Sequence, residues 1–110
     1  MIALKDFEKV DIRVGTILES TFNDKLNKPS IILIIDFGSK IGLKKTSAQL
    51  TKNYNPDELI GKQIAAVINF PPKQIGKMIS EILVLGFPDD NNEPILVLPS
   101  KKVANGGKLF

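Results

Sequence analysis

The sequence predicts a small all-β domain, and three observations indicate this class. Most apolar residues fall in short alternating or β-branched runs that are separated by Gly, Pro and Asn. The chain has 110 residues, which suits one domain and is too short for two independent cores. Its 43% hydrophobic and 25% charged residues are typical of a globular protein. We therefore expect a single domain over residues 1–110.

Five or six strands are expected, most of them in apolar runs. Residues 11–20 place Ile12, Val14 and Leu18 at alternate positions, which predicts a strand with these side chains on one face and Arg13 facing outward. Gly15 within this run indicates a bulge or a sharp bend. The remaining strands are expected at residues 30–37, 43–50, 63–70, 80–86 and 94–99.

Polar, Gly-rich and Pro-rich stretches connect these strands. Asn55 begins a short helix that continues to Leu59 and is closed by Gly61. Pro71 and Pro72 end the strand before them, because proline cannot donate to a β-ladder. One or two helical turns are expected at residues 4–9, and turns at 23–29, 89–92 and 105–107.

The order of these elements selects one architecture among all-β folds. A helix after the third strand is what a five-stranded Greek-key barrel of the OB type requires. A β-sandwich is the alternative, but it usually has about seven strands and no helix in mid-chain. We therefore expect an OB-type barrel with a short helix between strands three and four, and with short terminal extensions.

The composition excludes most catalytic chemistry. The chain has no Cys and no His, so it lacks a thiol nucleophile and the most common general base and transition-metal ligand. Two adjacent acid pairs, 57–58 and 89–90, lie in turn-like sequence where solvation or helix capping explains them. The first 15 residues contain no apolar stretch of the length of a signal peptide. We expect a cytoplasmic protein that is not an enzyme and needs no cofactor or metal.

Basic charge is concentrated in the middle of the chain. Residues 38–77 hold seven lysines and two acidic residues, a net charge of +5, whereas the whole chain has +3. Such a block is typical of a protein that binds a polyanion, although a solvated surface that aids solubility would look the same. Arg13 is the single arginine, so phosphate attraction and shape would dominate over base readout.

The aromatic residues are scattered along the sequence rather than clustered. Phe37 and Phe70 end apolar strands and are expected in the core. Proteins that bind single strands stack bases on exposed, clustered aromatic side chains. The pattern therefore favours recognition of a folded RNA by its backbone and shape.

Three stretches in order resemble a known family. They are Asp11–Ile17 (DIRVGTI), Ile35–Gly38 (IDFG) followed by Ser47, and Asn69–Lys73 (NFPPK) followed by Gly76 and residues 80–83 (SEIL). Together they resemble the tRNA-binding domain of the EMAP II, Arc1p and methionyl-tRNA synthetase C-terminal type, an OB-fold. The variants at 45–49 (KTSAQ), 69–72 (NFPP) and 80–86 (SEILVLG) are similar to the CsaA group. The likeness covers residues 5–110.

This resemblance implies a homodimer that binds tRNA, and CsaA proteins are also described as export-related chaperones of unfolded polypeptides. The broader family often has Arg where this chain has Leu43, and Ser-Gln-Gly-Met where it has residues 80–83, so carboxylate Glu81 replaces a neutral amide. The negative charge of Glu81 would repel a nearby phosphate, so this change favours the polypeptide-binding role over tRNA binding. The implied nucleic-acid contacts are Asn69, Lys73, Ser80 and Glu81, with Lys44, Lys45, Ser47 and Gln49 on the polar strand before the helix.

Several of these positions allow two interpretations. Arg13 would contact RNA or pair with Asp11 or Asp36. Asn69 would contact a nucleotide or cap a turn, as Asn commonly does. Lys73 and Lys77 flank Gly76 in a loop and would bind phosphate. The pair Ser80–Glu81 would be functional or the polar entry to a strand. The segments Phe70-Pro71-Pro72 and Phe87-Pro88 would line a peptide groove if exposed, and form barrel corners if buried.

Apolar residues near both termini predict self-association. Isolated apolar side chains in segments 1–9 and 100–110 would leave surface to cover on a small barrel, and a symmetric dimer is the most common solution. These side chains are Ile2, Leu4, Phe7, Leu109 and Phe110.

Overall fold

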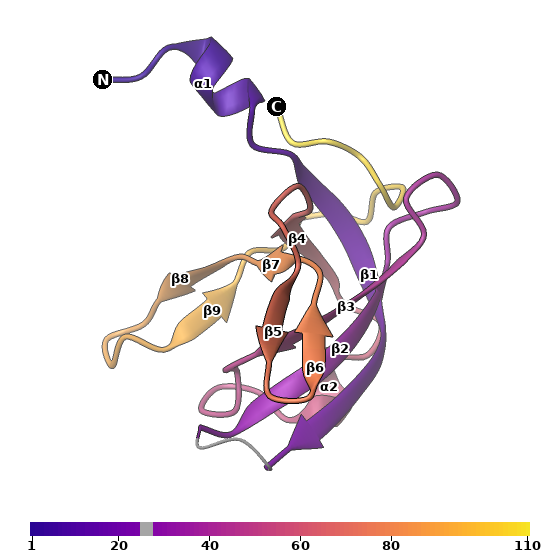
Figure 1. Cartoon of the computed structure of the whole chain (residues 1–110), viewed down its shortest axis with the longest axis vertical. Helices are drawn as coiled ribbons and strands as arrows, with labels where there is room; N and C mark the ends of the chain where they lie inside the picture. The colour runs from indigo at the N-terminus through magenta and orange to yellow at the C-terminus, as the bar shows by residue number, and fades with distance from the viewer. Residues whose placement is uncertain (25–27) are drawn as a thin grey trace.

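The computed structural model describes residues 1–24 and 28–110 and shows a curled antiparallel sheet with two small hairpins beside it (Figure 1). The sheet has the strand order β3-β2-β1-β4-β7. Its strands are β1 (Ile12–Asn23), β2 (Ser30–Asp36), β3 (Leu43–Ala48), β4 (Gln63–Val67) and β7 (Leu83–Val84). The mostly β content and the half-barrel curl confirm the predicted OB-like fold.

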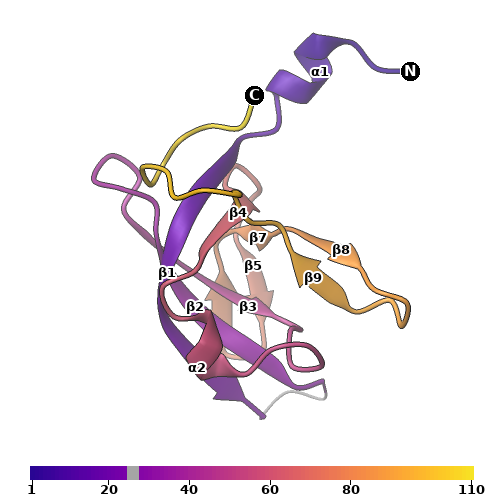
Figure 2. The same cartoon turned by 180° about the vertical axis from the view of Figure 1, so that it is seen from behind.

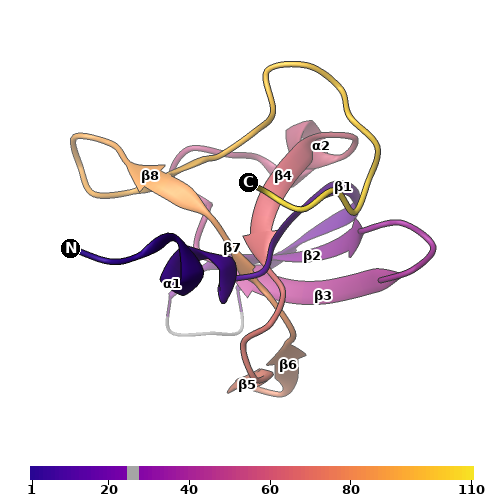
Figure 3. The same cartoon turned by 90° about the horizontal axis from the view of Figure 1, so that it is seen from above.

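Two short helices and two hairpins complete the chain. Helix α1 (Leu4–Glu8) precedes the sheet, and α2 (Pro56–Leu59) lies between β3 and β4, as expected. One hairpin is β5 (Lys73–Ile75) with β6 (Met78–Ser80), and the other is β8 (Gly86–Pro88) with β9 (Pro94–Leu96). Figure 2 shows α2 from behind, and Figure 3 shows the two hairpins extending away from the sheet in different directions.

Strand β1 joins the two halves of the sheet. Its first residues pair with β4, from Ile12 opposite Val67 to Thr16 opposite Gln63. The rest of β1 pairs with β2, and the register shifts between Ile17 and Glu19. A bulge of this kind bends its strand, which lets the sheet curl into a half-barrel.

The burial of β1 corrects two expectations about it. The buried positions are Gly15 and Ile17, whereas Leu18 is 44% exposed, so the predicted face of Ile12, Val14 and Leu18 is wrong. Of the bulge or sharp bend expected at Gly15, the bulge is misplaced, because the register shift follows Ile17. Gly15 instead permits close packing: a Cβ there would lie 2.7 Å from Ile35 Cγ2 and 2.8 Å from the Phe37 ring.

The core fills the inside of the curled sheet. It contains mostly isoleucines of β1, β2 and β4 together with Phe37, which follows β2, and Leu59 of α2, which is fully buried. Phe37 is 1% exposed, as expected, but Phe70 is 53% exposed and lies beyond the end of β4 at Val67. The predicted core position of Phe70 is therefore wrong, because Pro71 and Pro72 follow it and the chain leaves the sheet.

The region after Pro72 differs most from the expected elements. The sequence predicts a loop there, but β5 and β6 form a hairpin around Gly76, whose φ of +60° suits glycine. The expected strand over residues 80–86 is divided among β6, β7 and β8, because the chain passes from the hairpin to the sheet edge and then into the next hairpin. The expected turn at 23–29 includes residues 25–27, which lie outside the described residues.

No helix of the described ranges is long and apolar enough to cross a membrane.

Candidate nucleic-acid interface

A groove of about 760 Å³ lies where β3, the β5–β6 hairpin and the β7–β8 segment meet. Seven of the predicted site residues line it, from three separate parts of the chain. They are Ser47, Gln49, Phe70, Pro71, Lys73, Ser80 and Glu81. The fold thus brings together the β3 motif and the two motifs around Pro71 and Ser80.

Buried hydroxyl groups hold the floor of this groove. Thr46 is 2% exposed and its Oγ1 donates to the carbonyl oxygen of Ile82 at 3.0 Å. The Oγ of Ser80, which is 7% exposed, lies 2.6 Å from Thr46 Oγ1. These hydrogen bonds join β3 to the segment that leads into β7, so Ser80 is a structural part of the groove as well as a lining residue.

Glu81 is tied to β3 by both its backbone and its side chain. Its N–H donates to the carbonyl oxygen of Lys45 at 2.9 Å, and its Oε1 accepts the N–H of Lys45 at 3.0 Å. The other carboxylate oxygen lies 3.9 Å from Lys44 Nζ. The carboxylate is therefore partly neutralised and fixed in place, which weakens its repulsion of a nearby phosphate.

Four lysines from the predicted set lie on elements that border the groove, and one of them, Lys73, is in its lining. Lys44 and Lys45 are on β3, Lys73 begins β5, and Lys77 lies in the exposed turn between β5 and β6. Lys28, which no sequence motif singled out, adds a further cation to the groove lining. Ammonium groups at such positions can attract phosphates from several directions, which suits recognition of shape rather than of bases.

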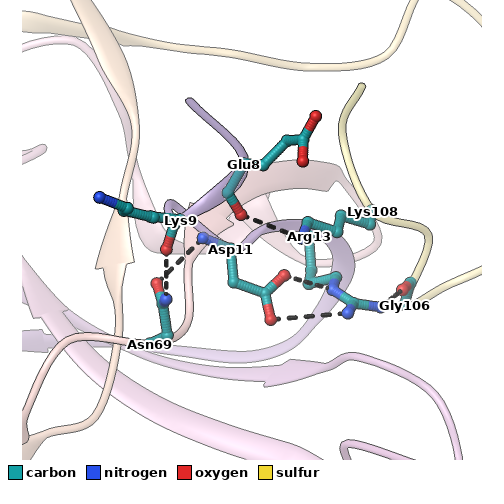
Figure 4. A network of polar contacts seen from close by, with 7 residues as sticks. All are labelled: Glu8, Lys9, Asp11, Arg13, Asn69, Gly106 and Lys108. Carbon is teal, nitrogen blue, oxygen red and sulfur yellow. Dashed lines mark hydrogen bonds and ion pairs between the residues drawn. The ribbon is translucent and has the colours of Figure 1, made fainter. Parts of the chain in front are cut away.

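Arg13 and Asn69 lie away from the groove, in a polar network at the start of β1 (Figure 4). The Arg13 guanidinium donates to Asp11 Oδ1 at 2.6 Å and to the carbonyl oxygen of Gly106 at 2.9 Å. Lys108 Nζ donates to the Glu8 carbonyl oxygen at 3.4 Å. Of the two ion pairs considered for Arg13, the structure has the one with Asp11.

Asn69 holds the N-terminal segment in the same network. Its amide oxygen accepts the N–H of Asp11 at 3.0 Å, and its amide nitrogen donates to the carbonyl oxygen of Lys9 at 2.8 Å. Figure 4 shows the side chain between these two backbone groups. Neither Arg13 nor Asn69 lines the groove, so the structure separates them from the other predicted contacts.

The predicted peptide-binding residues are exposed. Phe70 is 53% exposed at the groove, and Phe87 is 69% exposed on β8. Pro72 is also exposed, next to Pro71 in the groove lining. The interpretation of these segments as buried barrel corners is therefore excluded.

Two further residues of the groove are not among the predicted site residues, although Leu83 stands within the motif at 80–83. Leu83 is 50% exposed and lines it, and Glu93 enters it from the β8–β9 hairpin. The turn predicted at 89–92 could have placed Glu93 at the groove, because such a turn returns the chain toward the sheet. In the described ranges, no cluster of three or more Asp, Glu, His or Cys side chains could hold a metal ion.

Comparison with known proteins identifies this arrangement. A family model described as "Putative tRNA binding domain" matches residues 12–108, which include the groove and most of the β1 network. The chain belongs to this family. It is 33% identical over 108 residues to the methionine–tRNA ligase of Porphyromonas gingivalis, but it spans 15% of that enzyme's length.

Two solved structures of family relatives match the whole chain. The chaperone CsaA of Bacillus anthracis has 43% identity and a TM-score of 0.94, with 100% of this chain and 99% of that chain covered. The CsaA chaperone protein of Picrophilus torridus has 48% identity and a TM-score of 0.91, with both chains fully covered. The resemblance to the CsaA group expected from the sequence is thus confirmed.

Proposed function

We propose that this tRNA-binding domain binds tRNA and catalyses no reaction. The family match over residues 12–108 carries the proposal. The lysines on β3 and on the β5–β6 hairpin support it, because they add positive charge to the elements that border the groove. The matched ligase is an enzyme, but this chain corresponds to 15% of it. A cytoplasmic location would follow from a tRNA ligand.

A salt titration with charge-reversal variants tests tRNA binding. We expect the logarithm of tRNA affinity to fall linearly with the logarithm of salt concentration. In a Lys73→Glu/Lys77→Glu variant, affinity at low salt should fall and the slope should decrease by about one for each phosphate that the protein no longer neutralises. Binding can be followed by fluorescence anisotropy of labelled tRNA.

The matched control is Lys101→Glu/Lys102→Glu. It makes the same change in net charge at two exposed residues that do not line the groove. If both variants lose affinity equally, net charge rather than the groove governs binding. If wild-type protein binds no tRNA at low salt, the proposed function is wrong.

A second candidate function is an export-related chaperone that binds unfolded polypeptides. The exposure of Phe70 and Phe87 favours it, and the two similar crystal structures are both of CsaA chaperones. We expect equimolar protein to suppress the aggregation of an unfolded client, and a Phe70→Ser/Phe87→Ser variant to lose this effect. Unchanged suppression by the variant would remove these side chains from the role.

We further propose that two copies of the chain form a symmetric homodimer. An apolar pocket at the start of β1 is lined by residues of the C-terminal segment, including Leu98, Val103 and Leu109, and by Phe110, which is fully exposed. Leu4 of α1 is 71% exposed as well. Such surface is typically covered in an oligomer. Sedimentation equilibrium at micromolar concentration should give the mass of a dimer, and a monomer would contradict the proposal.

A further inference from the structure

We propose that the groove binds an extended polypeptide by strand addition to the outer edge of β3 at Ser47. The ligand would be recognised through its main chain, and its apolar side chains would contact the walls of the groove. This inference goes beyond tRNA binding and does not depend on it. It specifies the contact that a polypeptide ligand would make.

The hydrogen bonds of Lys45 show which way the backbone N–H and carbonyl groups of β3 point. Both the N–H and the carbonyl oxygen of Lys45 bond to Glu81, so they point away from β2. In an antiparallel ladder, residues alternate between those bonded to one neighbour and those that face the other side. Ser47 is two residues further on and lies opposite Ile32, so its N–H and carbonyl group also point away from β2.

The strand nearest to this outer edge, β6, contacts β3 but pairs its backbone with β5 instead. Before Glu81, β6 pairs with β5, with Ser80 opposite Lys73. In the part of the chain that the structure describes, no backbone hydrogen bond from another segment reaches the outer side of Ser47. The groove begins at this point, and Ser47 lines it. An unpaired edge residue beside an open groove is the geometry that strand addition uses.

The Ser47 side chain is engaged in the protein itself. Its Oγ donates to the Oγ of Ser30 at 2.9 Å, between β3 and the start of β2. The main chain is therefore what Ser47 offers to a ligand: one donor and one acceptor with the spacing of a β-bridge. A second polypeptide in an extended conformation satisfies both groups at once.

The lining of the groove is neutral and partly apolar, whereas Lys44, Lys45 and Lys77, which would attract tRNA, lie outside this lining. Phe70 and Leu83 are half-exposed and line it. Its charged lining residues are two lysines and two glutamates, which together carry no net charge: Lys28, Lys73, Glu81 and Glu93. A polyanion gains from unbalanced positive charge, whereas an apolar strand gains from burial of its alternate side chains against such walls.

The experiment uses a fluorescent heptapeptide of alternating Thr and Val and a series in which one amide at a time is N-methylated. N-methylation removes one main-chain donor and leaves the side chains unchanged. Strand addition predicts a period of two: alternate positions should lose about tenfold in affinity, as expected when a backbone hydrogen bond is removed. The positions between them should change little. An effect without this alternation, or no peptide binding, would overturn the proposal.

Protein variants test the same contact from the other side. Ser47→Pro removes the outward N–H without removing a bond to β2, which an edge strand tolerates. The control Ser47→Ala keeps this N–H and loses the same bond to Ser30. We expect Ser47→Pro, but not Ser47→Ala, to weaken peptide binding about tenfold.

Both variants are first checked for an unchanged circular dichroism spectrum. If Ser47→Pro does not fold, the N-methylation series on the wild-type protein still tests whether the peptide is bound through its main chain. Equal effects of the two Ser47 variants would contradict main-chain recognition. Binding of a single-stranded oligoribonucleotide in the groove, with no binding of the heptapeptide, would assign the edge to RNA and overturn the proposal.

Discussion

Glu81 takes the place of a strand partner for Lys45. It donates its own N–H to the Lys45 carbonyl oxygen at 2.9 Å, and its carboxylate accepts the Lys45 N–H at 3.0 Å, where a backbone carbonyl would accept in a regular ladder. The contact joins β3 to the segment before β7, the two outer strands of the sheet. One acidic side chain thus helps to close the half-barrel and limits how far the groove extends along β3.

Replacement of Glu81 tests this closing role. Glu81→Ala leaves the Lys45 N–H without its acceptor, and we expect the free energy of unfolding to fall by about 1 kcal/mol. Glu81→Gln keeps an acceptor oxygen and loses the partly exposed ion pair with Lys44, so its effect should be smaller. Urea denaturation followed by circular dichroism measures both. Equal destabilisation by the two variants would show that the charge matters more than the acceptor.

The close packing at Gly15 leads to a second prediction. Gly15→Ala would place its Cβ 2.7 Å from Ile35 Cγ2, against two buried side chains of the core. We expect a loss of about 1–3 kcal/mol of unfolding free energy, as is typical of overpacking. Gly107→Ala is the control, because its Cβ would meet the nearest atoms at 3.8 Å. A Gly15→Ala protein as stable as wild type would contradict this packing.

The same position shows how far the sequence predicts the fold. The order of strands and the mid-chain helix follow from apolar runs and turn residues, and these local signals are sufficient for an OB-like barrel. The buried face of β1 does not follow, because Gly15 has no side chain to mark it and the register shifts after Ile17. A tertiary contact with Phe37 decides this face, and alternation within one strand cannot reveal it.

The sequence likewise predicts part of the candidate site but not all of it. Motifs identify the β3 residues and the pair at Ser80 and Glu81, and the fold places both on one groove. They cannot show that Arg13 and Asn69 lie in another network, because that depends on where the two terminal segments pass. Three-residue strands such as β5 carry too few residues for a periodic signal, so the sequence predicts a loop in place of the hairpin.

Asn69 is expected to hold the N-terminal segment in place rather than to contact RNA. Asn69→Ala removes both side-chain hydrogen bonds, to Asp11 and to Lys9. We expect faster amide exchange at Asp11 and a loss of about 1 kcal/mol or less of unfolding free energy, because the bonds are exposed. The tRNA affinity should change by less than about twofold if Asn69 contacts no nucleotide. A large loss of affinity with normal exchange at Asp11 would instead establish a direct RNA contact.

Asp89 organises the tip of the β8–β9 hairpin and predicts its pH dependence. Hydrogen bonds from the Asn53 side chain and from the backbone N–H groups of Glu93 and Asn91 hold the pKa of Asp89 below its ordinary value of 3.8. A carboxylate with a depressed pKa stabilises the folded hairpin above its unfolded pKa and loses this effect as pH falls through the folded pKa. We therefore expect the hairpin contacts to weaken only below about pH 4.

Amide chemical shifts of Asn91 and Glu93 in an acid titration measure this effect. Their N–H groups donate to Asp89 Oδ1 at 2.8 and 2.9 Å, so both shifts should move together as the carboxylate is protonated. In an Asp89→Asn variant, which does not titrate at this position, the transition should be absent. A transition above the ordinary pKa of an aspartate would contradict the assigned direction.

The amide of Ser47 gives a test of the β3 edge that needs no ligand. The residues before and after it, Thr46 and Ala48, pair with β2 with their backbone groups directed inward, because they alternate with Lys45 and Ser47. Hydrogen exchange measured by NMR should therefore be fast at Ser47 and slower, on the order of tenfold or more, at its two neighbours. Addition of the heptapeptide should slow exchange at Ser47 alone among the three. Equal protection of all three amides in the free protein would mean that the outer edge of β3 is already covered and cannot accept a strand.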